Sequence, residues 1–204
     1  MIDRIIFVRH GETVDNARGI AQGWGDSELS VKGQAQVEKL ALRLKGFQPT
    51  DLFCSTLPRA IATARAISDV LELEIQEVDD LREMNCGDWE GISFASVRER
   101  EPEVFRNWAD DPTVKCPGGE SFEDLAARMA RALEHIQTRA DGRAQCVVIV
   151  SHGTAIRVVA TSLLGLELSA AKRFAQDNAA INVFEWRAAK YILRTWNDTT
   201  HCPS

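Results

Sequence analysis

Two histidines of this chain each follow an apolar run and precede a glycine. His10 follows the run at 5–8 and Arg9, and His152 follows the run at 146–150 and Ser151. Such runs are typical of buried parallel strands, and ligands of open α/β sheets bind at the carboxyl ends of these strands. A histidine met once in this place is more often structural, and a lone Arg-His-Gly segment could be an ordinary surface turn. Because the pattern occurs twice, we expect both imidazoles at one edge of one sheet.

Charged residues follow two further strands of the predicted sheet. Arg59 lies in the first turn of the helix that follows a strand at 52–54, and Glu83 follows a strand at 75–78. Arg9 and Arg59 carry guanidinium forks that match phosphate oxygens. An isolated helix arginine is by default a solvated side chain, but here both arginines and the carboxylate are expected at the edge that holds the histidines.

These residue types suit phosphoryl transfer. One histidine can attack phosphorus and carry the phosphoryl group, which divides one displacement into two. Two arginines and the other histidine can bind the three equatorial oxygens, and a carboxylic acid can protonate the departing alkoxide. The sequence holds no glycine-rich Walker loop, no His-Glu-x-x-His and no aspartate cluster for magnesium. No metal and no cofactor are therefore expected.

Strand patterns alternate with helix patterns along the chain, which predicts an α/β fold. We expect a three-layer α/β/α sandwich with a mainly parallel central sheet. A polar loop is predicted over 15–30, and a hairpin over 181–186 and 191–196 ends the fold. The predicted helices carry apolar stripes, capping serines or closing glycines, and they span about 30–46, 56–71, 121–136 and 153–165.

The segment from Leu81 to Pro117 differs from the rest because it is rich in Trp, Glu and Arg and has no strand pattern. It predicts a small helical insertion, about 84–117, over the carboxyl-terminal edge of the sheet. Within it, Phe105 and Trp108 are expected to form core and not a substrate platform. The chain has no internal repeat and no linker, so 1–204 is expected to be one domain.

Composition limits the classes of function. The net charge of −6 argues against non-specific nucleic-acid binding, which needs a basic face. No apolar run approaches the ~20 residues that span a bilayer, and no secretory signal precedes the first strand, so we expect a soluble, cytoplasmic protein without membrane contact. The five cysteines are dispersed and form no Cys-x-x-Cys pair, which indicates packing residues and neither disulfides nor a zinc site.

Several motifs, taken in order, resemble the histidine phosphatase superfamily, which is also called phosphoglycerate-mutase-like. The resemblance covers nearly the whole chain. It rests on Arg9-His10-Gly11-Glu12-Thr13 with Asn16, Gln22-Gly23, 55–64, Leu81-Arg82-Glu83, 87–91, 117–121 and Ser151-His152-Gly153. Each motif is weak alone, but the ordered set is specific, and every catalytic position is matched.

The resemblance implies a role for each match. It makes His10 the nucleophile and Glu83 the general acid, which then serves as base for the attacking water. The remaining matches bind the substrate: the phosphate is held by Arg9, Arg59, His152 and Asn16, and the leaving group is lined by Gln22 and Gly23. Members of the family also form homodimers, so a homodimer is possible here.

The tail at 197–201 is similar to the tails of small phosphatases of this family. In some of them a terminal histidine closes over the substrate, and His201 would be that residue here, with a frayed tail as the alternative. This tail and the segment 177–180 favour phosphoserine as substrate. Other members of the phosphatase branch act on α-ribazole phosphate or glucosyl-phosphoglycerate, so the particular ester stays open.

The leading hypothesis is a metal-independent phosphomonoesterase that acts on a small phosphorylated metabolite through a phosphohistidine. A cofactor-dependent phosphoglycerate mutase is the first alternative. Family mutases are typically longer, and the segment 87–91 is more like the phosphatase branch. A non-catalytic protein that binds phosphorylated ligands is the second alternative. It should lack a catalytic group, and this sequence retains all of them.

Overall fold

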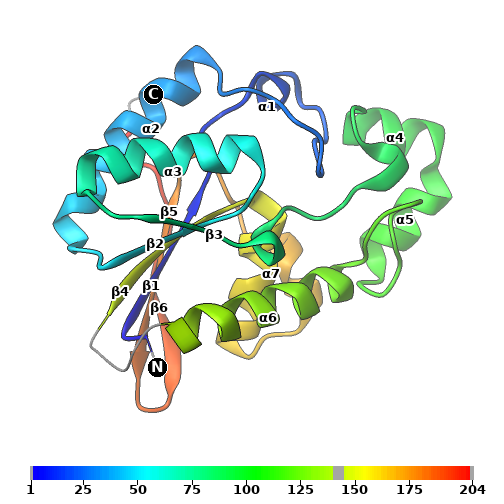
Figure 1. The fold of residues 1–204 in the computed structure, drawn as a ribbon. Coiled ribbons are helices and arrows are strands. Elements are labelled where there is room, and N and C mark those ends of the chain that lie inside the picture. Colours follow the sequence, from blue (N-terminus) through cyan, green and yellow to red (C-terminus); the bar gives the residue numbers. More distant parts are fainter. Residues whose placement is uncertain (1, 140–144, 203–204) are drawn as a thin grey trace.

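A six-stranded sheet forms the centre of the computed structural model, which describes residues 2–139 and 145–202 (Figure 1). The strand order is β3-β2-β4-β1-β5-β6. The first four strands in this order are parallel, whereas β5 is antiparallel to β1 and β6 is antiparallel to β5. The strands are β1 (Arg4–Arg9), β2 (Asp51–Cys54), β3 (Ile75–Glu77), β4 (Cys146–Ser151), β5 (Ile181–Arg187) and β6 (Lys190–Asp198). The mainly parallel sheet and the closing hairpin are confirmed.

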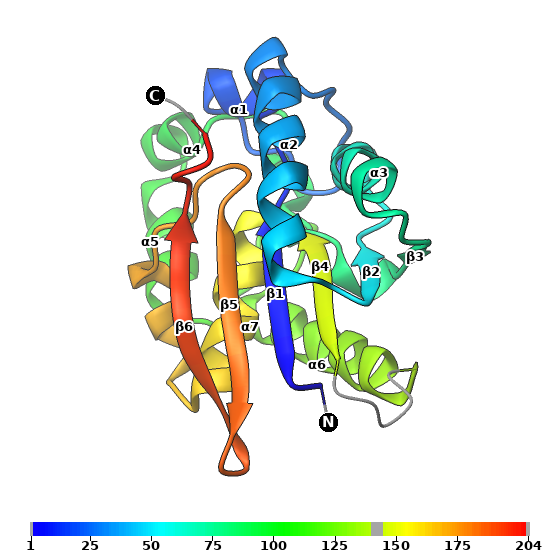
Figure 2. The same ribbon diagram turned by 90° about the vertical axis from the view of Figure 1, so that its left-hand side faces the viewer.

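Helices cover both faces of the sheet, as Figure 1 shows, and Figure 2 shows α2 crossing in front of the strands. Side chains of β1 alternate between the two layers: Ile6 and Val8 pack with α2 and α3, and Ile5 and Phe7 pack with α6 and α7. The three-layer α/β/α arrangement is therefore confirmed. The long helices are α2 (Val31–Leu44), α3 (Pro58–Leu71), α6 (Phe122–Arg139) and α7 (Gly153–Leu164).

Local signals in the sequence account for the helix ends. Ser30 Oγ accepts a hydrogen bond from Gly33 N at 3.0 Å and caps α2. Ser121 Oγ accepts from Asp124 N, and the Asp124 carboxylate accepts from Ser121 N, which forms a capping box before α6. Gly165 ends α7 with a φ of 65°.

The prediction of an uninterrupted loop over 15–30 was wrong. The helix α1 (Val14–Arg18) occupies its first part. Thr13 Oγ1 accepts from Asn16 N at 3.1 Å, and Asn16 Oδ1 accepts from Thr13 N at 3.2 Å. The same short polar side chains that indicate a loop satisfy the free N–H groups of a one-turn helix here.

The insertion is helical and lies to one side of the sheet (Figure 1). It contains α4 (Phe94–Arg100) and α5 (Pro102–Asp110). Trp108 is buried, and its ring lies 5.3 Å from that of Trp89 and 5.6 Å from that of Phe105, so the predicted core role is confirmed. No helix within the described part of the chain has the length and apolarity to cross a membrane. Short 3₁₀ segments are η1 (Lys45–Phe47), η2 (Asp79–Leu81), η3 (Gly87–Trp89) and η4 (Leu168–Arg173).

The segment that follows β1 packs directly on the start of α2. A Cβ atom on Gly33 would overlap the Glu12 carbonyl oxygen, and a Cβ on Gly11 would lie 2.9 Å from the Gly33 carbonyl oxygen. The Gly11 N–H donates to Thr63 Oγ1 of α3 at 3.1 Å. Both α2 and α3 therefore hold the backbone next to His10.

We expect Gly33→Ala to destabilise the fold, although alanine normally favours a helix, because the new methyl group has no room. The expected loss in the free energy of unfolding is about 1–3 kcal/mol, the cost of overpacking. Gly46→Ala is the matched control, since the atom nearest to its Cβ would be 3.8 Å away. Urea denaturation measures both variants. Equal stability of Gly33→Ala and Gly46→Ala would contradict the close approach.

Candidate active site

The pairing of β1 with β4 brings the two histidines together. Arg9 is the register partner of Ser151, so the following residues, His10 and His152, leave the sheet side by side. His10 N donates to Ser151 O at 3.1 Å, and the centroids of the imidazole rings are 5.1 Å apart. Both side chains are buried. The structure thus brings these two predicted residues to one edge of the sheet.

The contact of His10 with the next residue selects a tautomer. Nδ1 lies 2.8 Å from the Gly11 carbonyl oxygen. A carbonyl only accepts hydrogen bonds, so Nδ1 carries the hydrogen and Nε2 of the neutral ring holds a lone pair. Burial, followed by the positive charges of Arg59 and Arg9, holds the pKa of His10 well below 6.5. At neutral pH the ring is therefore an uncharged nucleophile with Nε2 free to react.

His152 is held by the residue that follows β2. Its Nε2 lies 2.7 Å from Ser55 Oγ, and Ser55 Oγ accepts a hydrogen bond from Leu57 N. Nδ1 is buried and has no hydrogen-bond partner within the described residues. Burial and then the charge of Arg59 lower the pKa of His152 well below 6.5. His152 does not border the cavity itself, although the next residue, Gly153, does.

Arg59 is buried and Arg9 is partly buried, and both cations line a cavity of about 260 Å³ next to His10. Arg9 Nη1 donates to the Gln176 carbonyl, and burial lowers the pKa of Arg9 to about 10, so it stays charged at neutral pH. Arg59 Nη1 donates to Gly25 O at 2.8 Å and Nη2 donates to Gly23 O at 2.7 Å. The Nε atoms of both arginines are buried and have no partner among the described residues.

Glu83 approaches the cavity from η2 and is fixed by the start of α7. Oε1 accepts from Ala155 N at 3.1 Å and from Met84 N at 2.8 Å, and Oε2 accepts from Thr154 N at 3.0 Å. The N–H groups of Thr154 and Ala155 are free donors at the N-terminus of α7, which attract a carboxylate. Oε2 accepts only this one bond within the described residues, so a lone pair remains for a proton.

The predicted substrate-binding residues of the N-terminal loops also line the cavity, and they are Asn16, Gln22 and Gly23. Asn16 Oδ1 accepts from Asn178 Nδ2 at 3.0 Å in addition to its bond within α1. Gln22 Oε1 is buried without a partner among the described residues. Gly23 has a φ of 51°, and a Cβ there would collide with the Glu90 carboxylate. A glycine is therefore required where this loop passes Glu90.

His201 is not among the residues that line the cavity. The strand β6 runs in the same direction as β1, so the tail begins at the correct edge of the sheet. The imidazole is half-buried, and burial lowers its pKa. The Ala179 backbone and the Asp198 carboxylate act in the opposite direction and raise this pKa, but burial has the larger effect. The structure does not bring His201 to the other predicted residues, and its role stays a prediction.

Arg157 and Gln176 are among the cavity residues that the sequence analysis missed. Arg157 lies one turn into α7, where Nε donates to Gly153 O at 3.2 Å and burial lowers its pKa. Its place four residues after Gly153 on a helix is a signal that could have been used. Gln176 is 8% exposed, and both atoms of its amide group lack a partner within the described residues. It follows no strand, so only the fold reveals it.

The charges that line the cavity define its ligand. Three arginines, Arg9, Arg59 and Arg157, face a single carboxylate, Glu83. A chain with a net charge of −6 therefore has a cationic cavity. Some buried N–H groups of its lining residues have no hydrogen-bond partner within the described residues and could donate to a ligand. This combination fits a phosphate group. Within the described residues, no three His, Cys, Asp or Glu side chains gather in a way that could hold a metal ion.

The family follows from comparison with known sequences. The sequence model of the histidine phosphatase superfamily (branch 1) matches residues 5–199. The chain therefore belongs to the histidine phosphatase superfamily, as its motifs predict. It is a phosphatase of that superfamily.

Individual relatives agree with this assignment. Phosphoserine phosphatase 1 of Hydrogenobacter thermophilus is 34% identical over 97% of this chain and 93% of its own. The metal-independent phosphoserine phosphatase of Arabidopsis thaliana is 35% identical over 100% of this chain and 84% of its own. The crystal structure of a mutant phosphoserine phosphatase from Entamoeba histolytica in complex with phosphoserine has a TM-score of 0.85 and 28% identity, with 97% of this chain and 98% of that chain covered.

The buried neutral histidines make stability depend on pH. In the unfolded chain both imidazoles take up protons near pH 6.5, whereas the folded protein keeps His10 and His152 neutral. The unfolded state therefore binds more protons as the pH falls, and the free energy of unfolding decreases. Each histidine contributes a decrease of up to about 1.4 kcal/mol per pH unit below pH 6.5. Urea denaturation at pH 7.5, 6.5 and 5.5 measures this slope.

The variant His10→Asn removes one of the two groups and should flatten the decline between pH 6.5 and 5.5. His135→Asn serves as the control for the same replacement at a histidine outside the site, because His135 is exposed on α6. A wild-type slope in His10→Asn would show that His10 does not stay neutral in the folded state.

Proposed function

We propose that this protein is a metal-independent phosphomonoesterase that hydrolyses a small phosphorylated metabolite through a phosphohistidine at His10. The observation that carries the proposal is the bond from His10 Nδ1 to the Gly11 carbonyl, which leaves Nε2 as a lone-pair nitrogen in a cationic cavity. The Arabidopsis thaliana relative is a metal-independent phosphoserine phosphatase, which supports metal independence.

In the first step, Nε2 of His10 attacks phosphorus and the bond from phosphorus to the ester oxygen breaks. Arg9 and Arg59 line the cavity and stabilise the negative charge on the equatorial oxygens, and His152 is proposed as a third donor through Nδ1, which has no partner within the described residues. Protonated Glu83 transfers its proton to the departing oxygen, so the alcohol leaves neutral and Glu83 becomes a carboxylate.

In the second step, a water molecule replaces the alcohol. The Glu83 carboxylate accepts a proton from the water as its oxygen attacks phosphorus, and the bond from phosphorus to Nε2 breaks. Inorganic phosphate leaves, His10 returns to its neutral form, and Glu83 is again a carboxylic acid. The two steps consume one water and need no metal ion.

Phosphoserine is the substrate that we favour. The relatives from Hydrogenobacter thermophilus and Arabidopsis thaliana are named as phosphoserine phosphatases, and the related Entamoeba histolytica enzyme was crystallised with phosphoserine. The cavity of about 260 Å³ suits a small ester. The amide groups of Gln22 and Gln176 line this cavity and offer hydrogen bonds to a polar leaving group.

Phosphate release in the presence of EDTA tests the function. The panel contains phosphoserine, 3-phosphoglycerate, α-ribazole phosphate and p-nitrophenyl phosphate, with a parallel mutase assay in the presence of 2,3-bisphosphoglycerate. We expect release from at least one physiological ester with a kcat/KM of at least ~10⁴ M⁻¹s⁻¹. We expect His10→Ala to lower kcat by at least ~10³-fold, because removal of a nucleophile costs at least this much.

His135→Ala is the matched control, since it removes an exposed histidine and should keep full activity. Wild-type activity in His10→Ala would remove His10 from the nucleophile role. Isomerisation of phosphoglycerate without net phosphate release would instead identify a mutase.

His201 is proposed to contact the leaving group after the tail moves toward the cavity. We expect His201→Ala to lower kcat/KM for phosphoserine much more than kcat/KM for p-nitrophenyl phosphate, because only the former offers polar groups beyond the phosphate. Steady-state kinetics with both esters measures this difference. Equal losses with the two esters, or none, would exclude this role for His201.

A further inference from the structure

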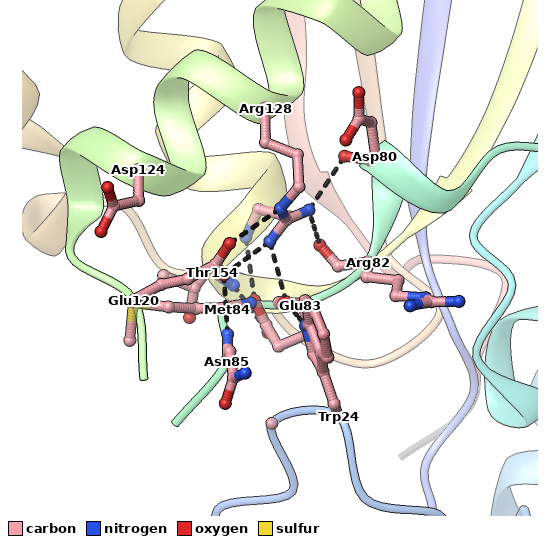
Figure 3. A network of polar contacts seen from close by, with 12 residues as sticks. Trp24, Asp80, Arg82, Glu83, Met84, Asn85, Glu120, Asp124, Arg128 and Thr154 are labelled. Carbon is pink, nitrogen blue, oxygen red and sulfur yellow. Dashed lines mark hydrogen bonds and ion pairs between the residues drawn. The ribbon is translucent and has the colours of Figure 1, made fainter. Parts of the chain in front are cut away.

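An ion pair between a buried arginine and a partly buried glutamate lies behind the turn that carries Glu83 (Figure 3). Arg128 is in the middle of α6 and is only 7% exposed. Its Nε donates to Glu120 Oε1 at 3.0 Å, and its Nη2 donates to Glu120 Oε2 at 2.8 Å. The carboxylate therefore holds one edge of the guanidinium in a fixed, two-point geometry.

The other edge of the guanidinium binds the backbone of the turn. Nη1 donates to the carbonyl oxygens of Asp80 and Arg82, both at 2.9 Å, and Nη2 donates to the carbonyl oxygen of Glu83 at 3.0 Å. As Figure 3 shows, these bonds converge from one side chain on the chain segment immediately before and at Glu83. One arginine thus fixes three peptide groups of the turn.

Glu120 continues the contact beyond Glu83. Its Oε2 accepts from the Asn85 N–H at 2.8 Å, and the Asn85 carbonyl accepts from Glu120 N at 2.9 Å. The ion pair therefore holds the backbone on both sides of residue 83. The Glu83 side chain is bound at its far end by the N–H groups of Thr154 and Ala155. Its carboxylate is consequently fixed from α6 and from α7 at once.

Stability alone is a poor explanation for this pair. A buried ion pair loses about as much in desolvation as it gains in attraction, and apolar residues of similar volume often replace one without loss. A directional network of five bonds does something that apolar packing cannot, because it specifies where a peptide segment lies. Here that segment presents the carboxylate of the cavity.

We propose that Arg128, oriented by Glu120, is a positioning residue that keeps the Glu83 carboxyl group aligned with the leaving-group oxygen. The proposal rests on the proposed function, in which Glu83 protonates that oxygen. Misplacement of a reacting group by about 1 Å can reduce the rate by about 10²-fold. The loss should depend on how much the leaving group needs a proton.

Two substitutions test the proposal. Arg128→Lys keeps the charge but cannot reach the same five acceptors, and the double variant Arg128→Met/Glu120→Gln leaves no unpaired buried charge if the single variant folds poorly. We compare kcat/KM for p-nitrophenyl phosphate with kcat/KM for the alkyl phosphate that the wild type cleaves fastest. The value of kcat/KM reports on the steps up to departure of the alcohol.

We expect kcat/KM for the alkyl phosphate to fall by about 10²-fold, because an alkoxide must be protonated as it leaves. p-Nitrophenolate is stable without a proton, so its kcat/KM should fall by less than about 3-fold. In the Glu83→Gln background, where no acid remains, Arg128→Lys should not change the ratio between the two esters any further.

Arg131→Ala is the matched control. Arg131 lies one turn further along α6 and binds the Asp80 carboxylate through Nε and Nη2, both at 3.1 Å, without contacting the backbone of the turn. It should leave the ratio unchanged. Equal losses with both esters in folded Arg128 variants would show a merely structural role and overturn the proposal. An inactive wild type would overturn the proposed function itself, and the positioning role with it.

Discussion

The parallel pairing of β1 with β4 is the constraint on which the site depends. It fixes the two imidazoles, since Arg9 and Ser151 are register partners and the histidines follow directly. It also fixes the carboxylate, because β4 continues through His152 into α7, whose first N–H groups bind Glu83. Three groups from distant parts of the chain are therefore held in place by one ladder of backbone hydrogen bonds.

Burial and the charges around the cavity determine the protonation state of the two imidazoles. Arg9, Arg59 and Arg157 line the cavity of an acidic protein, and burial, followed by the positive charge of Arg59, holds the pKa of both neighbouring imidazoles well below 6.5. A neutral imidazole is a nucleophile, whereas an imidazolium is not. Buried polar atoms without partners in the described residues gather at the same place, among them Arg9 Nε and both atoms of the Gln176 amide group. Such atoms are costly unless a ligand satisfies them.

The sequence predicts the centre of the site better than its support. Parallel strands end at one edge of a sheet, so a residue type after each strand suffices to bring His10, His152 and Glu83 together. Arg128 binds the Glu83 carbonyl although the two residues are 45 positions apart in the sequence. This contact depends on how α6 packs against the turn, and no local sequence pattern predicts that packing. One signal was present: Arg128 lies three residues after Leu125, within the apolar stripe of the helix, where a cation needs a partner. At 15–30 a local pattern was present but was misinterpreted. Its polar residues predict a loop, whereas in the structure they cap a short helix.

The burial of Arg59 affects how strongly the cavity can bind an anion. Both of its terminal nitrogens already bind the carbonyls of Gly23 and Gly25, and its side chain is 2% exposed. A long arginine side chain on a surface loses rotamer entropy when it closes on a phosphate. Arg59 lost that freedom when the chain folded. An arriving anion meets a charge that is already desolvated and in place, so its affinity is not reduced by the ordering of this side chain.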